Sequence, residues 1–169
     1  RLAVMRRSLL AGLVEAAGGN LRRGAERVLL GEVGRVFFAR GAEIAEEERL
    51  ALALAGTVGA WDAVRQADFL DLKGVLEVVL AELGVNDPVW RPSTVPLLAP
   101  GEGAEVLAGH RVVAVAGRLA DPVAEAFDLP APLWVAELDL AAAEAGQVPT
   151  FRSLPRFPAV TADLTVRHE

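Results

Sequence analysis

The spacing of the apolar residues is the feature that most constrains the fold, because it changes along the chain between the spacing of a helix and the short runs of β-strands. One stretch has apolar residues at helical spacing, at positions 72, 75, 76, 79, 80 and 83. Asp68 or Asp71 can cap its start, and Gly84 stands where it would end. On both sides of this stretch lie short apolar runs separated by turn residues, which is typical of β-strands. The pattern therefore predicts helices inserted among strands.

The predicted strands fall into hairpins. Residues 27–38 and 49–56 form one pair of strands, and the acidic stretch 42–48 reads as a solvated loop between them. Residues 104–119 form a second hairpin that turns at 108–110. Since hairpins pair strands antiparallel, we expect an α+β domain whose antiparallel sheet carries helices on one side.

Three further segments have clear local signals. Ser8 precedes apolar residues at helical spacing and is the expected N-cap of a helix over 8–23. Four prolines in 88–103 exclude a helix and a central strand, so this segment is an edge or a loop. Asp121 with a proline after it predicts the cap of a short helix, 121–127.

The composition excludes several classes of protein. The chain of 169 residues is 53% hydrophobic and has no cysteine, so disulfides, thiolate nucleophiles and cysteine metal sites are ruled out. Its longest apolar run, 50–61, is too short and too interrupted to span a bilayer, and its start does not resemble a signal peptide. We therefore expect a cytoplasmic protein with no membrane partner.

The charge is unevenly distributed. The net charge of −6 disfavours an independent nucleic-acid binder. Residues 1–40, however, carry eight arginines against three glutamates. RNA contact by this basic quarter therefore stays open as an alternative function.

Two carboxylates are the strongest candidates for chemistry. Glu137 and Asp139 stand two positions apart on the predicted strand 133–140, so they share one face at a separation of roughly 5 to 9 Å, as glycosidase acid–base pairs do. A stand-alone enzyme of this kind would need the pair to line a pocket, with one carboxyl pKa raised by burial. The alternative is structural: Glu137 pairs with an arginine of a neighbouring strand, and Asp139 caps a short helix at 141–146. No motif indicates a zinc site, a dinucleotide site or a serine nucleophile.

Several stretches, taken in order, resemble one family, the beta subunit of bacterial phenylalanyl-tRNA synthetase. They are VMRRSLLAGLVEAAGGNLRRG (4–24), LLGEVGRVF (29–37), FLDLKGVLEVVLAELG (69–84), LAPGEGAEVLAGHRVVAVAGRLADPVAEAFDL (98–129), VAELDL (135–140) and FRSLPRFPAVTADLTV (151–166). The resemblance covers essentially the whole chain. It implies a class II aminoacyl-tRNA synthetase-like fold, α+β, with a mainly antiparallel sheet flanked by helices.

The resemblance also implies how the chain is divided. Residues 1–150 match the class II-like core module. Residues 151–169 match a linker and the first strand of a following ferredoxin-like, anticodon-binding-type domain, which is truncated. We therefore expect a fragment excised from a longer subunit.

A comparison with what a class II active site needs predicts that this module is inactive. Arg35 is kept in the hairpin that would clamp ATP, but the return strand 50–55 is leucine and alanine only. Glu137 and Asp139 occupy positions where the site needs glycines, and Ala142 stands where it needs an arginine. Two carboxylates placed against a triphosphate are strongly unfavourable. We expect no cofactor in this fragment, with ATP and Mg²⁺ belonging to the whole enzyme.

The remaining expectations concern partners. The resemblance implies a non-catalytic module that docks on the catalytic alpha subunit of an (αβ)₂ heterotetramer, which joins phenylalanine to tRNA(Phe). Apolar surface is the usual mark of such docking. The expected interface residues are on the first helix: Leu9, Leu10, Leu13 and Val14.

Overall fold

The computed structural model describes residues 4–41, 43–59 and 64–144. Its elements, in chain order, are α1 (Leu10–Arg22), β1 (Arg27–Arg40), β2 (Glu43–Val58), β3 (Arg65–Gln66), α2 (Phe69–Glu82), β4 (Val89–Pro92), β5 (Leu98–Ala108), β6 (Arg111–Leu119), α3 (Asp121–Ala126), β7 (Trp134–Asp139) and α4 (Leu140–Glu144). The segment 151–169, predicted to begin a following domain, lies outside the described residues.

All described strands belong to one antiparallel sheet. Six of them follow the order β1-β2-β7-β6-β5-β4, and the two-residue β3 pairs with the end of β2. The proline-containing β4 lies at one edge, as the prolines predicted. The turn between β5 and β6 falls at Gly109, whose φ of 61° is in the left-handed region that favours glycine. The expected antiparallel sheet is confirmed.

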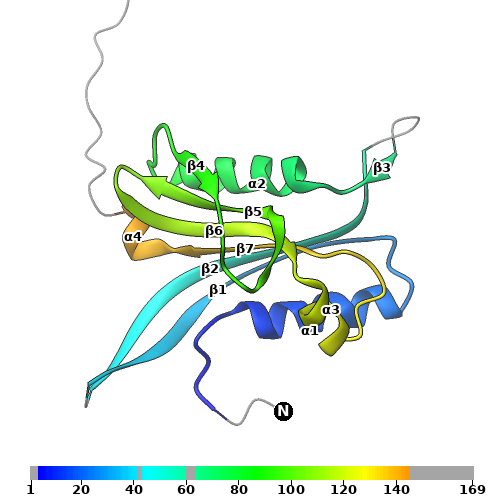
Figure 1. Ribbon diagram of the computed structural model, residues 1–169, viewed down its shortest axis with the longest axis horizontal. Helices are drawn as coiled ribbons and strands as arrows, with labels where there is room; N and C mark the ends of the chain where they lie inside the picture. The colour runs from blue at the N-terminus through cyan, green and yellow to red at the C-terminus, as the bar shows by residue number, and fades with distance from the viewer. Residues whose placement is uncertain (1–3, 42, 60–63, 145–169) are drawn as a thin grey trace, which may run out of the picture.

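The first hairpin is longer than predicted. β1 and β2 pair from Arg27 with Gly56 out to Arg40 with Glu43, so the acidic stretch 42–48 is strand from Glu43 onward and the loop prediction is wrong. Two of the three consecutive glutamates 46–48 pair with arginines of β1: Arg35 Nη1 lies 3.0 Å from Glu46 Oε2, and Arg40 Nη2 lies 3.0 Å from Glu47 Oε1. Cross-strand ion pairs make a charged run compatible with an exposed strand. The hairpin extends beyond the rest of the sheet in Figure 1.

Helices cover both faces of the sheet, so the prediction of helices on one side is also wrong. α1 and α3 lie on one side of the sheet and α2 on the other (Figure 1). β2 explains why: Ala51, Ala53 and Ala55 pack under α1, while Leu52 and Leu54 pack in the core with α2. Since alternate residues of a strand face opposite ways, a run of leucine and alanine makes both faces apolar, and both must be covered.

The helix α2 forms as its sequence predicts. Leu72, Leu76 and Leu80 are fully buried. At its start the Asp68 carboxylate accepts the amides of Leu70 and Asp71, and the Asp71 carboxylate accepts the amide of Asp68. This capping box satisfies donors that a helix start leaves free.

The short helix α3 begins differently from the prediction. Its N-cap is Ala120, with no side-chain cap, and Asp121 is the first helical residue. The Asp121 carboxylate pairs instead with the Arg118 guanidinium. Separately, no helix in the described ranges is long and apolar enough to cross a membrane.

Candidate functional site

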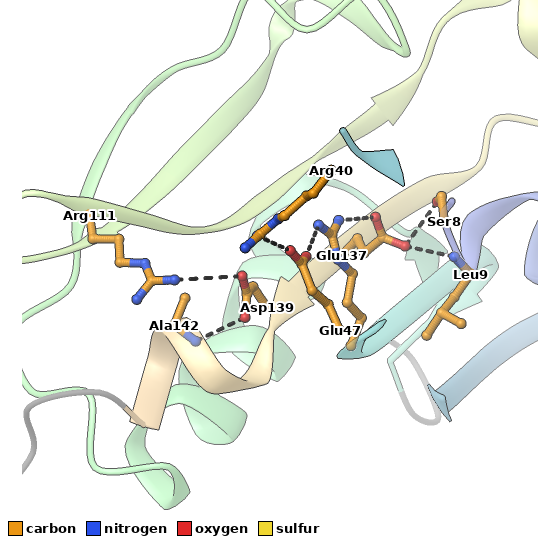
Figure 2. A network of polar contacts seen from close by, with 9 residues as sticks. Ser8, Leu9, Arg40, Glu47, Arg111, Glu137, Asp139 and Ala142 are labelled. Carbon is orange, nitrogen blue, oxygen red and sulfur yellow. Dashed lines mark hydrogen bonds and ion pairs between the residues drawn. The ribbon is translucent and has the colours of Figure 1, made fainter. Parts of the chain in front are cut away.

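Glu137 is a buried carboxylate at the centre of a polar network between β7 and the start of α1. It is only 7% exposed. Its Oε1 accepts hydrogen bonds from the Ser8 hydroxyl at 2.9 Å and from the Leu9 amide at 2.7 Å, and its Oε2 accepts one from Arg49 Nη1 at 3.0 Å. Figure 2 shows these groups converging on the carboxylate from separate segments. The charge of Glu137 is therefore compensated, as a buried charge must be.

Arg49 extends the network along β2. It also donates to Glu47 at 2.9 Å, and Glu47 accepts from Arg40 at 3.0 Å. The Arg49 guanidinium lies 5.0 Å from the centroid of the Phe38 ring. Burial lowers the pKa of Arg49, but the hydrogen bonds and charges of Glu47 and Glu137 outweigh it, so the pKa of Arg49 is raised above its usual value. Arg49 is held as a cation opposite two carboxylates.

Asp139 has a separate role from Glu137. Its Oδ1 accepts the amide of Ala142 at 2.9 Å, which caps the first turn of α4. Its Oδ2 lies 4.0 Å from Arg111 Nη2 (Figure 2). Capping by an aspartate satisfies a backbone donor at a helix start.

The two carboxylates are not an acid–base pair. Glu137 is bound by an arginine of the neighbouring strand β2, and Asp139 caps the helix that follows, as the structural alternative predicted. Both oxygens of Glu137 accept hydrogen bonds within the chain. The enzyme hypothesis that depends on this pair is contradicted by these contacts.

The four residues compared with a class II site do not form one cluster. Asp139 and Ala142 are in contact, with Ala142 2% exposed in the core under α2, whereas Glu137 bonds to the start of α1. Arg35 does not join them: its neighbour Val36 is buried under α1, so Arg35 points to the other face of the sheet, where it pairs with Glu46. The one basic residue kept from the expected site therefore lies on the face opposite Glu137.

The residues expected to form an interface are core residues. Leu9, Leu10, Leu13 and Val14 are 1%, 4%, 5% and 2% exposed, because the sheet of the same chain covers them. The prediction that they form a partner interface is wrong. An apolar stripe on a helix indicates that the stripe is buried, but it does not indicate which chain buries it.

The arginines of the basic first quarter are largely bonded within the chain. Arg6 bonds Glu32 and the Arg35 carbonyl, and Arg22 bonds the carbonyls of Phe127 and Asp128. Arg35 and Arg40 pair with glutamates of β2. These contacts weaken the case for a phosphate-binding surface, because the guanidinium groups already have acceptors.

The sequence missed two participants in the network. An arginine partner for Glu137 was expected, but Arg49 was not identified. It is the basic residue that directly precedes the apolar part of β2, and this position is the signal that could have found it. Ser8 is predicted to be the N-cap of α1, but the N-cap is Leu9, which has no side-chain cap. The Ser8 hydroxyl instead accepts the amide of Leu10, the first helical residue, at 3.1 Å. Its bond to Glu137, 129 residues away, has no signal in the local sequence.

The residues of this site do not fit a nucleotide or a metal. A triphosphate at this face would lie against the Glu137 carboxylate. The arginine beside it, Arg49, already donates to Glu137 and Glu47, and Arg35 lies on the opposite face. The residues that the structure describes also contain no group of three or more His, Cys, Asp or Glu that could hold a metal ion.

Comparisons with known proteins agree on one family. The family model described as "Phenylalanyl tRNA synthetase beta chain CLM domain" matches residues 1–140. The chain is 42% identical, over 97% of its length, to the phenylalanine–tRNA ligase beta subunit of Moorella thermoacetica, and 37% identical, over 98%, to that of Hahella chejuensis. It spans about a fifth of the length of these relatives, 21% in each case.

A solved structure shares the fold. The pyrrolysyl-tRNA synthetase of Desulfitobacterium hafniense superposes with a TM-score of 0.62 over 82% of this chain and 48% of that chain, at 17% identity. The likeness confirms the class II synthetase-like α+β fold.

Proposed function

We propose a function from one premise: the chain belongs to the CLM-domain family of the phenylalanyl-tRNA synthetase beta chain. The proposed function is a non-catalytic structural module of a phenylalanine–tRNA ligase beta subunit. It supports assembly with the catalytic alpha subunit in an (αβ)₂ heterotetramer, in the cytoplasm. ATP, Mg²⁺, phenylalanine and tRNA(Phe) are used by that whole enzyme.

The observation that carries this proposal is the engagement of Glu137. A nucleotide site needs space and positive charge on this face of the sheet. Instead, the Glu137 carboxylate is bonded to Ser8, Leu9 and Arg49 and is 7% exposed. A phosphate bound here would compete with the Glu137 and Glu47 carboxylates for Arg49, whose guanidinium already donates to both.

Exposed apolar side chains support a docking role. Leu29 and Val33 on the edge strand β1 are 54% and 59% exposed, although their side chains are large and apolar. Exposed apolar patches are typical of surfaces that bind a partner. These two side chains are therefore available to a partner, unlike the four buried residues of the first helix.

Co-purification tests the docking role. The chain, with the flanking segments of a related beta subunit restored, is expected to co-purify with the alpha subunit of that ligase. Val33→Glu should weaken the complex, whereas Val89→Glu should not, because Val89 is equally exposed, at 56%, on the opposite edge of the sheet. Failure of the unaltered chain to bind the alpha subunit would contradict the proposal.

Thermal unfolding tests the loss of catalysis. ATP with Mg²⁺ is expected to leave the Tm of the chain unchanged, because the module is proposed not to bind a nucleotide. Binding would be easy to detect: a ligand that binds only the folded state, at about 100 times its Kd, adds about 2.7 kcal/mol of stability. A saturable rise of Tm with ATP would show that the module still holds a nucleotide.

A further inference from the structure

A hollow lies on the face of the sheet opposite Glu137. It has a volume of about 380 Å³ and lies between the start of α2, the strands β4 and β5, and the start of β7. Phe69, Trp90 and Trp134 contribute aromatic side chains to its lining, and Gly101, Gly103 and Ala104 contribute small ones. Ligand sites in proteins are hollows of about 300–1,000 Å³ lined mainly by apolar and aromatic groups. This hollow is therefore of a suitable size for a small ligand.

The aromatic side chains are fixed relative to one another. The rings of Phe69 and Trp90 meet edge to face, with centroids 6.0 Å apart and planes at 90°. The Phe69 and Trp134 rings are 6.3 Å apart at 56°. Trp134 Nε1 is held by the Ala67 carbonyl at 2.9 Å. Aromatic rings pack against one another in such edge-to-face or tilted arrangements, so a further ring can continue the cluster.

This cluster is unusual in a chain with so few aromatic residues. Only 5% of the residues are aromatic, and two of the three tryptophans line this one hollow. All three rings stay partly exposed to solvent. They pack against the core with α2 on one side and line the hollow on the other.

The charged groups around the hollow are already paired. Arg91 donates to Glu105 at 2.7 and 2.8 Å, and Arg118 donates to both oxygens of Glu102 at 3.0 Å. These contacts raise the pKa of Arg118, chiefly through the hydrogen bond to Glu102. Lys73 Nζ lies 5.0 Å from the centroid of the Trp90 ring, so that ring already has a cation near it. Lys73 is itself paired with Glu77, so a charged ligand would compete with existing ion pairs among these residues.

The geometry points to a binding site for a small, uncharged, planar aromatic molecule in the hollow formed by Phe69, Trp90 and Trp134. Gly101, where an added Cβ would meet no heavy atom within 4 Å, and the small Ala104 leave room for the ligand beside the three rings. Trp90 Nε1 is buried without a hydrogen-bond partner among the described residues, so Trp90 meets the hollow through its ring carbons. The site is independent of the proposed docking role.

Quinoline is the probe, because it is planar, aromatic and uncharged at pH 7.5. It is titrated into the ¹⁵N-labelled 169-residue chain while the indole N–H signals of Trp90 and Trp134 are followed by NMR. Both signals should shift in a saturable manner, with a Kd on the order of 1 mM for a ligand of this size. Absence of a saturable shift in either signal up to about ten times that concentration overturns the proposal.

Two matched substitutions locate the site. Ala104→Leu fills the hollow and should weaken quinoline binding at least tenfold. Ala81→Leu makes the same change at an exposed position of α2 and should leave the Kd unchanged. If Ala104→Leu does not fold, Phe69→Leu replaces it, since that change removes one ring and keeps apolar volume. Equal binding by the blocked and control variants would also overturn the proposal.

Discussion

The two longest helices secure their first turns in different ways. At α2, Asp68 and Asp71 form a capping box, and every partner lies within three residues. At α1, the N-cap Leu9 has no capping side chain, and the nearby free amide of Leu9 is accepted by Glu137, 128 residues along the chain. The start of α2 is thus fixed by local sequence, whereas the start of α1 combines one local bond, from the Leu10 amide to the Ser8 hydroxyl, with a bond to Glu137 that forms only when the sheet has assembled. Glu137 on β7 is therefore an anchor for the first turn of α1.

The largest expected effect is the loss of that anchor. Glu137→Ala leaves the Ser8 hydroxyl, the Leu9 amide and one Arg49 donor without an acceptor in a buried place. We expect a loss of about 3 kcal/mol in the free energy of unfolding, measured by urea denaturation. Glu48→Ala, an exposed glutamate on β2, is the control and should change stability by less than about 0.5 kcal/mol. Equal effects of the two variants would refute the anchor.

The coupling between Ser8 and Glu137 is a finer test of the same contact. Ser8→Ala alone should cost about 1 kcal/mol, because the hydroxyl bonds both Glu137 and the Leu10 amide. In the Glu137→Ala background the cost should fall by about 0.5 kcal/mol or more, since the shared bond is already absent. Strict additivity in this double-mutant cycle would show that the bond contributes nothing.

Removal of the Asp68 cap of α2 should lower the free energy of unfolding by a similar amount, but its effect should be independent of the Ser8 contact. Asp68→Ala is expected to destabilise by about 1 kcal/mol, the usual value for an N-cap. Combined with Ser8→Ala, the two costs should add, because the two helix starts lie on opposite faces of the sheet. Marked non-additivity would mean that the two helix starts are not independent.

The smallest expected effect is the pH dependence of the α2 start. The hydrogen bond from Arg65, which is the largest cause, lowers the pKa of Asp71 below its usual value near 4. A lowered folded-state pKa gives stability that is present above about pH 4 and is lost as the pH falls through the folded-state value. Urea unfolding between pH 5 and pH 2 should show this loss, and Arg65→Ala should reduce it. An unchanged pH profile in Arg65→Ala would assign the dependence to other groups.

Much of the fold was predictable because its signals are local. The stripe of Leu72, Leu76 and Leu80, the caps at Asp68 and Asp71, and the turn at Gly109 each depend on residues close in sequence. The run of alternating leucine and alanine in β2 was read as a strand, but its second consequence, two apolar faces, was missed. The charged half of the same strand was misread because its glutamates gain their partners only across the hairpin.

In the candidate site, too, the features with a local signal were predictable and those that depend on packing were not. The capping role of Asp139 and an arginine partner for Glu137 follow from strand and helix rules, and the sequence predicted both. The exclusion of Leu9, Leu10, Leu13 and Val14 from any interface did not follow, because an apolar stripe has the same pattern against its own sheet as against another chain. The position of Arg35 away from Glu137 depends on which face each strand turns to the core.

The sequence by itself determined the family, the antiparallel sheet and the chemical types of the groups at positions 137, 139 and 142. These follow from residue identity and from spacing along the chain. The tertiary structure decided that Glu137 meets Ser8, Leu9 and Arg49, that helices cover both faces, and that Phe69, Trp90 and Trp134 surround one hollow. The physical reason is sequence separation: these contacts join segments from 21 to 129 residues apart, and only the packed sheet brings them within hydrogen-bond or van der Waals distance.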